Sequence, residues 1–172
     1  MQGDADVHVA GVQAGECVME MVGRFFSLRE ATCSDAAARL GLDNTPSTLQ
    51  HENIKYAAAR LDLVRECAGP LIVSSWFRSP AVNKAVGGAA TSAHMSGWAI
   101  DCRSESMSAL DLCKTAAACL RSRSTAWDQI IHEYGQWMHI SFDPHGRGEL
   151  LTIFDANKKY VRGLLTRQEY YG

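Results

Sequence analysis

Long apolar runs and a basic surface are both missing from this sequence. The 172 residues contain no stretch of about 18 to 20 apolar residues, the length that spans a membrane. The first residues lack the basic start and the continuous hydrophobic segment of a signal peptide. Acidic side chains outnumber basic ones by 19 to 17, which argues against nucleic acid or an anionic membrane as the main partner. We therefore expect a monomer that is made in the cytoplasm without a signal peptide and binds neither nucleic acid nor membrane.

Closely spaced cysteine pairs are absent as well. The six cysteines form no CxxC motif and are scattered over Cys17, Cys33, Cys67, Cys102, Cys113 and Cys119. This pattern predicts neither a disulfide framework nor a thiolate zinc site, and we expect buried free thiols instead. The chain also shows no internal repeat, linker or low-complexity segment. Its length and its 47% hydrophobic content suit one well-filled core, so we expect an N-terminal extension over residues 1–24 and a single domain over residues 25–172.

Capping signals and hydrophobic periodicity predict a mixed fold. Helices are expected at a capping box over Ser27–Glu30, from Ser34 to Gly41, from Thr45-Pro46 to Gly69-Pro70, after Ser79-Pro80, and over residues 108–120. Strands are expected over residues 71–73 and 98–103, in a tight hairpin of residues 128–134 and 136–142, and in a second hairpin over residues 150–164. This order predicts an α+β fold with helices packed on one side of a mainly antiparallel sheet.

His94, Asp101 and His139 together suggest a metal site. An imidazole, a carboxylate and a second imidazole form the open ligand set of catalytic zinc, which leaves the fourth position to water or substrate. Gly97 lies between the first two residues and lets a loop that carries the histidine turn back beside a strand that carries the aspartate. Taken singly, His94 suits a surface loop, Asp101 a turn and His139 a hydrogen-bonded core position. The combination of all three favours shared ligation.

Glu133 is the candidate general base. Every second side chain of a strand points to the same face, so a tight hairpin places Glu133 and His139 on one face of the sheet. A carboxylate beside the metal site is suited to take a proton from water and pass it to a leaving amine.

Several segments resemble one family of enzymes. They are Ser75-Trp76-Phe77-Arg78-Ser79-Pro80, Val82-Asn83, Val86-Gly87-Gly88 and Ser92-x-His94-x-x-Gly97-x-Ala99-x-Asp101. Their order resembles the zinc D-Ala-D-Ala carboxypeptidase family of metallopeptidases, and most closely its phage-type branch. Phe26-Ser27-Leu28-Arg29-Glu30 and Gly41-Leu42-Asp43-Asn44-Thr45-Pro46 resemble the N-terminal part of that branch, so the similarity covers residues 25–143. It implies a Hedgehog/D-Ala-D-Ala peptidase-like fold.

The resemblance also implies a cofactor and a set of roles. Zn²⁺ is the implied cofactor, and its implied ligands are His94, Asp101 and His139. The family places an arginine at Arg78, where it helps to bind or polarise the scissile group. A planar guanidinium suits this task because it holds two oxygens of a carbonyl or carboxylate at once. A surface ion pair is the alternative role for this arginine.

One position departs from the wider family. Several relatives place their catalytic glutamate three residues before the last histidine, where this chain has Gln136, whose amide cannot accept a proton at neutral pH. Glu133, six residues before His139, resembles the arrangement of the phage-type branch and of the related Hedgehog signalling domain, so the base is assigned there. Ser92 is expected either to bind substrate or to serve only as a loop residue. Trp137 is expected either to wall the pocket and contact substrate or to fill the core.

The predicted function is zinc-dependent hydrolysis of an amide bond in the peptidoglycan stem peptide. The enzyme would be a D,D-carboxypeptidase or an endopeptidase of endolysin type, with a phage-related role in cell-wall degradation. It would act on the wall after release from the cell or as a virion component. One alternative, which Gln136 favours, is a catalytically silent, zinc-stabilised virion-structural or binding module. Another is a zinc-free peptidoglycan-binding domain. The sequence leaves open which bond is cut.

Overall fold

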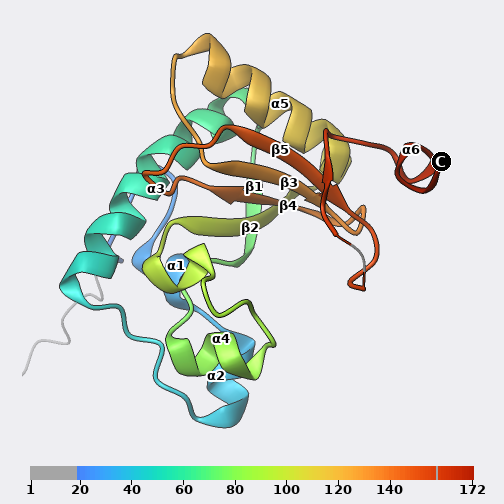
Figure 1. The fold of residues 1–172 in the computed structure, drawn as a ribbon. Helices are drawn as coiled ribbons and strands as arrows, with labels where there is room; N and C mark the ends of the chain where they lie inside the picture. Colours follow the sequence, from blue (N-terminus) through green and yellow to red (C-terminus); the bar gives the residue numbers. More distant parts are fainter. Residues whose placement is uncertain (1–18, 158) are drawn as a thin grey trace, which may run out of the picture.

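The computed structural model describes residues 19–157 and 159–172 (Figure 1). Its helices are α1 (Leu28–Thr32), α2 (Asp35–Leu40), α3 (Thr48–Ala68), α4 (Pro80–Ala85), the 3-10 helix η1 (Ala93–Ser96), α5 (Ala109–Ser122) and α6 (Arg167–Tyr171). Its strands are β1 (Leu71–Ser75), β2 (Ala99–Ser104), β3 (Gln129–Glu133), β4 (Trp137–Ser141), β5 (Glu149–Ile153) and β6 (Val161–Arg162). None of the helices in these two ranges is both long and apolar enough to span a membrane.

The strands form one six-stranded sheet in the order β1-β2-β4-β3-β5-β6. Neighbouring strands run antiparallel except for β3 and β5, which run parallel. Both predicted hairpins are present, since β3 pairs with β4 and β5 pairs with β6. In the first hairpin Tyr134 and Gly135 have φ angles of 55° and 72°, which lets the chain reverse tightly between the strands. The structure therefore confirms the predicted α+β fold with a mainly antiparallel sheet.

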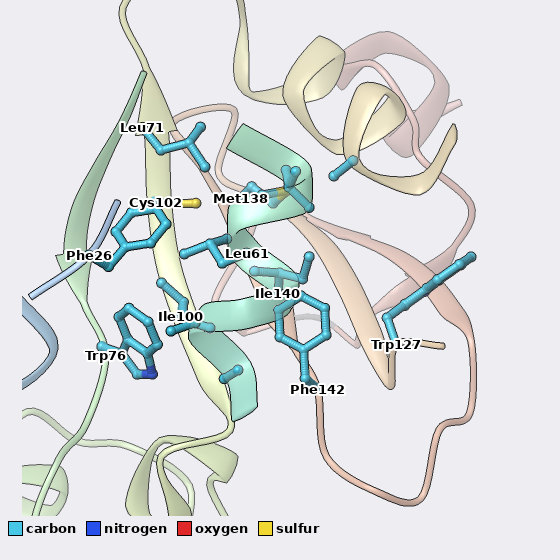
Figure 2. Packing of buried hydrophobic residues seen from close by; sticks show 14 of the residues in the cluster. Phe26, Leu61, Leu71, Trp76, Ile100, Cys102, Trp127, Met138, Ile140 and Phe142 are labelled. Carbon is cyan, nitrogen blue, oxygen red and sulfur yellow. The ribbon is translucent and has the colours of Figure 1, made fainter. Parts of the chain in front are cut away.

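Strand alternation divides the sheet into two faces. One face is buried in the main core through Ile100, Cys102, Ile130, Met138 and Ile140 (Figure 2). Helices α3 and α5 cover this face, because their buried stripes belong to the same cluster and the two helices contact each other. The opposite face carries Asp101, Glu133, Trp137 and His139, because side chains alternate between the two faces along each strand. The apolar packing on one side of the sheet thus holds these polar side chains together on the other.

The capping predictions are confirmed at most helix starts, with one correction. Ser27 and Glu30 form the predicted capping box of α1, and Ser34 caps α2, which ends at Gly41. The longest helix, however, begins at Thr48 and not at Thr45-Pro46. Ser47 and Gln50 form a capping box that supplies the first backbone donors of α3 with side-chain acceptors.

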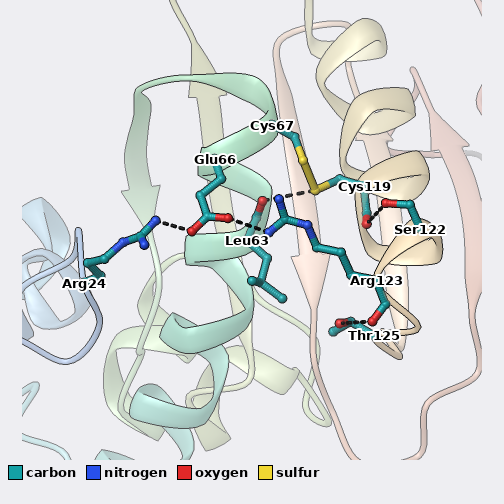
Figure 3. The surroundings of a disulfide bond; sticks show 8 residues. All are labelled: Arg24, Leu63, Glu66, Cys67, Cys119, Ser122, Arg123 and Thr125. Carbon is teal, nitrogen blue, oxygen red and sulfur yellow. Dashed lines mark hydrogen bonds and ion pairs between the residues drawn. A yellow bond between two sulfur atoms is a disulfide. The ribbon is translucent and has the colours of Figure 1, made fainter.

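The prediction of free thiols is wrong for two cysteines. Cys67 at the end of α3 and Cys119 in α5 form a disulfide, with their Cα atoms 6.3 Å apart (Figure 3). Their separation of 52 residues hides the pair in the sequence, and the packing of α3 against α5 creates it. Cys102 and Cys113 are buried and free, as expected, whereas Cys33 is free but exposed. Cys17 lies outside the described residues.

The predicted extension over residues 1–24 lies mostly outside the described part of the chain. Among its described residues, Val22 is buried in the main core, and the backbone N–H of Arg24 donates to Asp62 of α3 at 2.6 Å. Met21 forms a β-bridge with Ser27. This part of the chain therefore packs against α3.

Candidate metal centre

The short helix η1 positions His94. Gly97 ends η1 with a φ angle of 83°, a left-handed conformation that favours glycine. A Cβ atom at this position would lie 2.9 Å from a side-chain carbon of Ile54 and 3.0 Å from the carbonyl oxygen of Gln50, so only glycine lets η1 lie this close to α3. The side-chain amides of Gln50 and Asn53 donate to carbonyl oxygens of η1 at 2.9 Å and 2.8 Å. His94 is thereby held at a buried position above the sheet.

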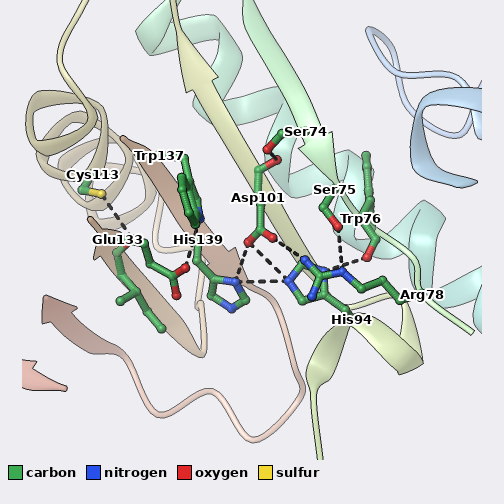
Figure 4. Close-up of polar contacts among 11 residues, drawn as sticks. Ser74, Ser75, Trp76, Arg78, His94, Asp101, Cys113, Glu133, Trp137 and His139 are labelled. Atoms are coloured by element: carbon green, nitrogen blue, oxygen red, sulfur yellow. Dashed lines mark hydrogen bonds and ion pairs between the residues drawn. The ribbon is translucent and has the colours of Figure 1, made fainter. Parts of the chain in front are cut away.

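The sheet positions Asp101 and His139. Asp101 of β2 and His139 of β4 are directly paired across the antiparallel ladder. Directly paired side chains point to the same face with their Cβ atoms close together. The Nδ1 atom of His139 accordingly lies 2.8 Å from Oδ1 of Asp101 (Figure 4).

These three side chains converge on one point. The Nε2 atom of His94 lies 3.3 Å from Oδ1 of Asp101 and 3.3 Å from Nδ1 of His139. Ligand atoms about 2.0 to 2.1 Å from a tetrahedral zinc ion stand about 3.3 Å apart. Two of the three donor distances match this spacing, and the third, 2.8 Å between Nδ1 of His139 and Oδ1 of Asp101, is shorter. The trio can therefore offer two imidazoles and a carboxylate to one zinc ion, and it is the one cluster of potential metal ligands among the described residues.

A carbonyl oxygen selects the tautomer of His94. Its Nδ1 atom lies 2.7 Å from the backbone carbonyl oxygen of Trp76. Because a carbonyl only accepts, Nδ1 carries the proton and Nε2 keeps its lone pair for a metal ion. The indole Nε1 of Trp76 in turn donates to the carbonyl oxygen of Gly97 at 3.0 Å. Trp76, just after β1, is thus bonded both to the ring of His94 and to the glycine that ends η1.

Arg78 contacts the carboxylate of the trio. Its Nη2 donates to Oδ2 of Asp101 at 2.6 Å, which leaves Oδ1 facing the two imidazoles. Its Nε donates to Oγ of Ser75 at 2.8 Å. Only 18% of the Arg78 side chain is exposed, so this is not the surface ion pair that the sequence left open.

Glu133 lies on the same face of the sheet as His139. It pairs with Trp137 across the hairpin, and Ile131 pairs with His139, so Glu133 is the diagonal neighbour of His139. The indole Nε1 of Trp137 donates to Oε2 of Glu133 at 3.0 Å. Gln136, by contrast, is exposed in the turn.

Burial and close charges shift the pKa values of the cluster. Burial opposes ionisation of Asp101, but His94 and His139 outweigh it and hold the pKa of this carboxyl well below its usual range. Burial lowers the pKa of His94 and so favours the neutral imidazole that metal ligation needs. Burial also works against the charge on His139, but its hydrogen bond to Asp101 prevails and raises its pKa. Burial raises the pKa of Glu133, which brings this carboxyl closer to the range of a general base.

A cavity of about 340 Å³ opens over the cluster. The three candidate ligands line it together with Arg78, Ser92, Glu133 and Trp137, so the structure brings all seven predicted site residues to one cavity. Ser92 directly precedes η1, and its hydroxyl forms no capping hydrogen bond with that helix. Trp137 is half-buried at the cavity wall and not in the core.

The remaining histidines of the described chain lie away from the trio. His132 points to the opposite face of the sheet, where its Nδ1 bonds to the carbonyl oxygen of Leu165. His145 is exposed in a loop beside Asp143, and His51 pairs with Glu20.

Sequence reasoning missed three contributors to the site. The carbonyl of Trp76 is invisible to motif analysis because a backbone group carries no residue signature. Ser75 orients Arg78, and its place in the segment Ser75–Pro80 was the available signal. Tyr160, which precedes β6, lines the cavity from a distant part of the chain, and no local pattern indicated it.

A family model described as Peptidase M15 matches residues 24–141. The match covers 118 of the 172 residues and includes the trio, Arg78 and Glu133, and it ends before β5. It confirms the resemblance that the sequence motifs indicated. No curated protein matches the chain.

Proposed function

Because the chain belongs to the Peptidase M15 family of zinc-dependent metallopeptidases, we propose that it hydrolyses an amide bond in the stem peptide of peptidoglycan. In this proposal His94, Asp101 and His139 hold the zinc ion. The observation that carries the proposal is that the ligand atoms of these three side chains lie close together at the wall of a cavity. Glu133 lines the same cavity.

When bound, a zinc ion would polarise the scissile carbonyl and lower the pKa of a water molecule from about 15.7 toward about 7. The trio leaves the cavity side open for substrate and water. The carbonyl of Trp76 keeps the lone pair of His94 Nε2 free for the metal, and the cross-strand pairing brings the side chains of Asp101 and His139 to the same site.

Glu133 is the proposed general base and acid. Its carboxylate accepts the proton of the attacking water and then donates it to the nitrogen of the leaving amine, so the acyl product gains the hydroxyl and the amine gains the hydrogen. The hydrogen bond from Trp137 Nε1 occupies Oε2, which leaves Oε1 for the proton. Gln136 takes no part, because its side chain is exposed in the turn.

Arg78 and Ser92 are the proposed substrate-binding groups. Arg78 lines the cavity while it holds Asp101, so its guanidinium is placed to stabilise negative charge on the scissile group. Ser92 and Trp137 line the same cavity and would contact the peptide backbone. The proposed role is phage-related degradation of the cell wall, after release from the cell or as part of a virion.

Metal analysis and mass spectrometry of muropeptides test the proposal together. We expect the zinc-loaded protein to cleave a stem peptide and Glu133→Gln to retain zinc while activity falls by about 10²-fold or more. The matched control Gln136→Glu should stay within about twofold of the wild type. His94→Ala should lose stoichiometric zinc and the stabilisation that a chelator removes from the wild type.

Each alternative has its own outcome. Stoichiometric zinc without any cleavage would assign the chain as a catalytically silent module. Unchanged metal content and thermal stability in His94→Ala would refute the zinc site itself. Full activity in Glu133→Gln would refute the assignment of the base.

A further inference from the structure

Tyr160 lies at the wall of the candidate metal centre, although it comes from the connection between β5 and β6. It lines the cavity of about 340 Å³ over the trio and also a cavity of about 520 Å³ that contains Glu133 and His139. Among the described residues, it is the one beyond position 141 that lines the first of these cavities. The matched family segment ends at that position, so the match gives Tyr160 no role.

The register of the sheet directs Tyr160 to the face of the metal centre. Ile153 of β5 pairs with Glu133 of β3 in the parallel ladder. Thr152 pairs with Val161 of β6, so the residue before Val161 continues the register opposite Ile153. Side chains that pair across a ladder point to the same side of the sheet. Tyr160 therefore points to the side that carries Glu133, in agreement with its place in both cavities.

The strand that leads to this connection is held against the β3–β4 turn. The backbone N–H of Tyr134 in the turn donates to the carbonyl oxygen of Ile153 at 2.7 Å. A Cβ atom on Gly135 would lie 3.1 Å from a ring carbon of Phe154, so the turn and the end of β5 are in close contact. Contacts with the hairpin of β3 and β4 thus fix the position from which Tyr160 reaches the cavity.

The hydroxyl of Tyr160 is available to a bound molecule. Within the part of the chain that the structure describes, it forms no hydrogen bond. Two other donors at the cavity are engaged, since Arg78 donates to Asp101. The indole of Trp137 likewise donates to Glu133. Tyr160 therefore adds a free hydrogen-bond donor to the wall of the site.

The phenol of Tyr160 keeps its proton at neutral pH. Burial raises its pKa above the ordinary value, and the negative charge of nearby Glu133 acts in the same direction. A protonated phenol donates a hydrogen bond and is a poor general base. Donors that point to the place where negative charge develops in a reaction lower its barrier.

We propose that Tyr160 is a further catalytic residue, whose hydroxyl donates a hydrogen bond to the oxygen of the scissile carbonyl as negative charge develops there. This inference rests on the proposed function and adds to it a residue from outside the matched family segment. The hydroxyl keeps its proton, so no bond is made or broken at Tyr160, and proton transfer stays with Glu133. Because the charge develops only in the transition state, the hydrogen bond should raise kcat and change KM little.

Tyr160→Phe tests the inference, because it deletes the hydroxyl and keeps the ring. We expect kcat for the stem peptide to fall by about 10- to 100-fold, with KM within about twofold and zinc content unchanged. The loss stays below that of a fully buried donor, since 52% of Tyr160 is exposed. Tyr56→Phe is the matched control and should keep wild-type activity, because Tyr56 of α3 lines neither cavity. An unchanged kcat in Tyr160→Phe, or a higher KM at constant kcat, would overturn the inference and leave the proposed hydrolysis intact.

Binding of an uncleavable analogue gives a second readout that does not depend on turnover. A phosphinate analogue of the stem peptide carries a negatively charged tetrahedral group in place of the scissile amide. In titration calorimetry with the zinc-loaded protein, Tyr160→Phe should weaken binding of this analogue by about 10- to 100-fold. The uncleaved peptide should bind Glu133→Gln and Glu133→Gln/Tyr160→Phe equally within about twofold.

The two ligands separate the possible roles of Tyr160. Equal weakening of peptide and analogue would overturn the catalytic role, because the hydroxyl would then serve ground-state binding alone. A wild-type protein that neither cleaves the peptide nor binds the analogue would refute the proposed function and the inference together.

Discussion

The disulfide between Cys67 and Cys119 makes a quantitative prediction about stability. The perturbation is the double variant Cys67→Ser/Cys119→Ser, or reduction of the wild type. In the chain-entropy model, a crosslink that closes a loop of 52 residues stabilises the fold by about 4 kcal/mol. Folded domains have a total stability of only about 5 to 15 kcal/mol, so this contribution is a large fraction. For a chain of this size, about 4 kcal/mol corresponds to a Tm lower by about 8 to 16 °C.

Urea and thermal unfolding with and without a thiol reductant measure this effect. The oxidised wild type should lose stability on reduction, and the double variant should resemble the reduced wild type in both conditions. Cys33→Ser is the matched control, since Cys33 is free and exposed and its loss should leave the unfolding midpoint unchanged. Equal midpoints for oxidised and reduced wild type would refute the argument. So would reaction of Cys67 with a thiol reagent in the folded, oxidised protein.

Three further predictions concern positions around the metal centre and the sheet. Gly97→Ala should lower the free energy of unfolding by about 1 to 3 kcal/mol in urea titrations, because the left-handed φ and the contact with α3 both resist a Cβ atom. Trp137→Phe removes the hydrogen bond that favours the charged form of Glu133, so the pKa of Glu133 should rise and the acidic limb of the kcat profile should move to higher pH. Burial opposes ionisation of Asp128, but hydrogen bonds from Arg147 prevail and lower its pKa, so this contribution to stability is present above about pH 4 and is lost as the pH falls below it. Asp128→Asn should therefore flatten the acid side of the stability profile, measured as Tm against pH, and an unchanged slope would contradict the ion pair.

Much of the candidate site was predictable because it depends on regularities between residues close together in the sequence. Alternation along two strands places Glu133 and His139 on one face, and the pairing of β3 with β4 agrees with this. The same rule turns Cys102 into the core, one residue after Asp101. The helix caps at Ser27 and Ser34 are equally local, since each serine side chain accepts a hydrogen bond from the backbone N–H three residues later.

The errors arise where local signals compete or where distant segments meet. Thr45-Pro46 has the residue types of a helix start, but the reciprocal bonds of Ser47 and Gln50 satisfy more donors and shift the start to Thr48. The pairing of Cys67 with Cys119 depends on how α3 packs against α5, which residue spacing does not encode.

The sequence by itself determined the chemistry of this protein: two imidazoles, a carboxylate, an arginine and a glutamate, in an order typical of one peptidase family. Residue type and the two-residue period of a strand are short-range properties, so both can be recognised without knowledge of the fold. Only the tertiary structure decided how Trp76 orients His94, which cysteines join, and that the candidate site residues line one cavity. These features depend on contacts between segments far apart in the chain, because burial of the shared core brings those segments together.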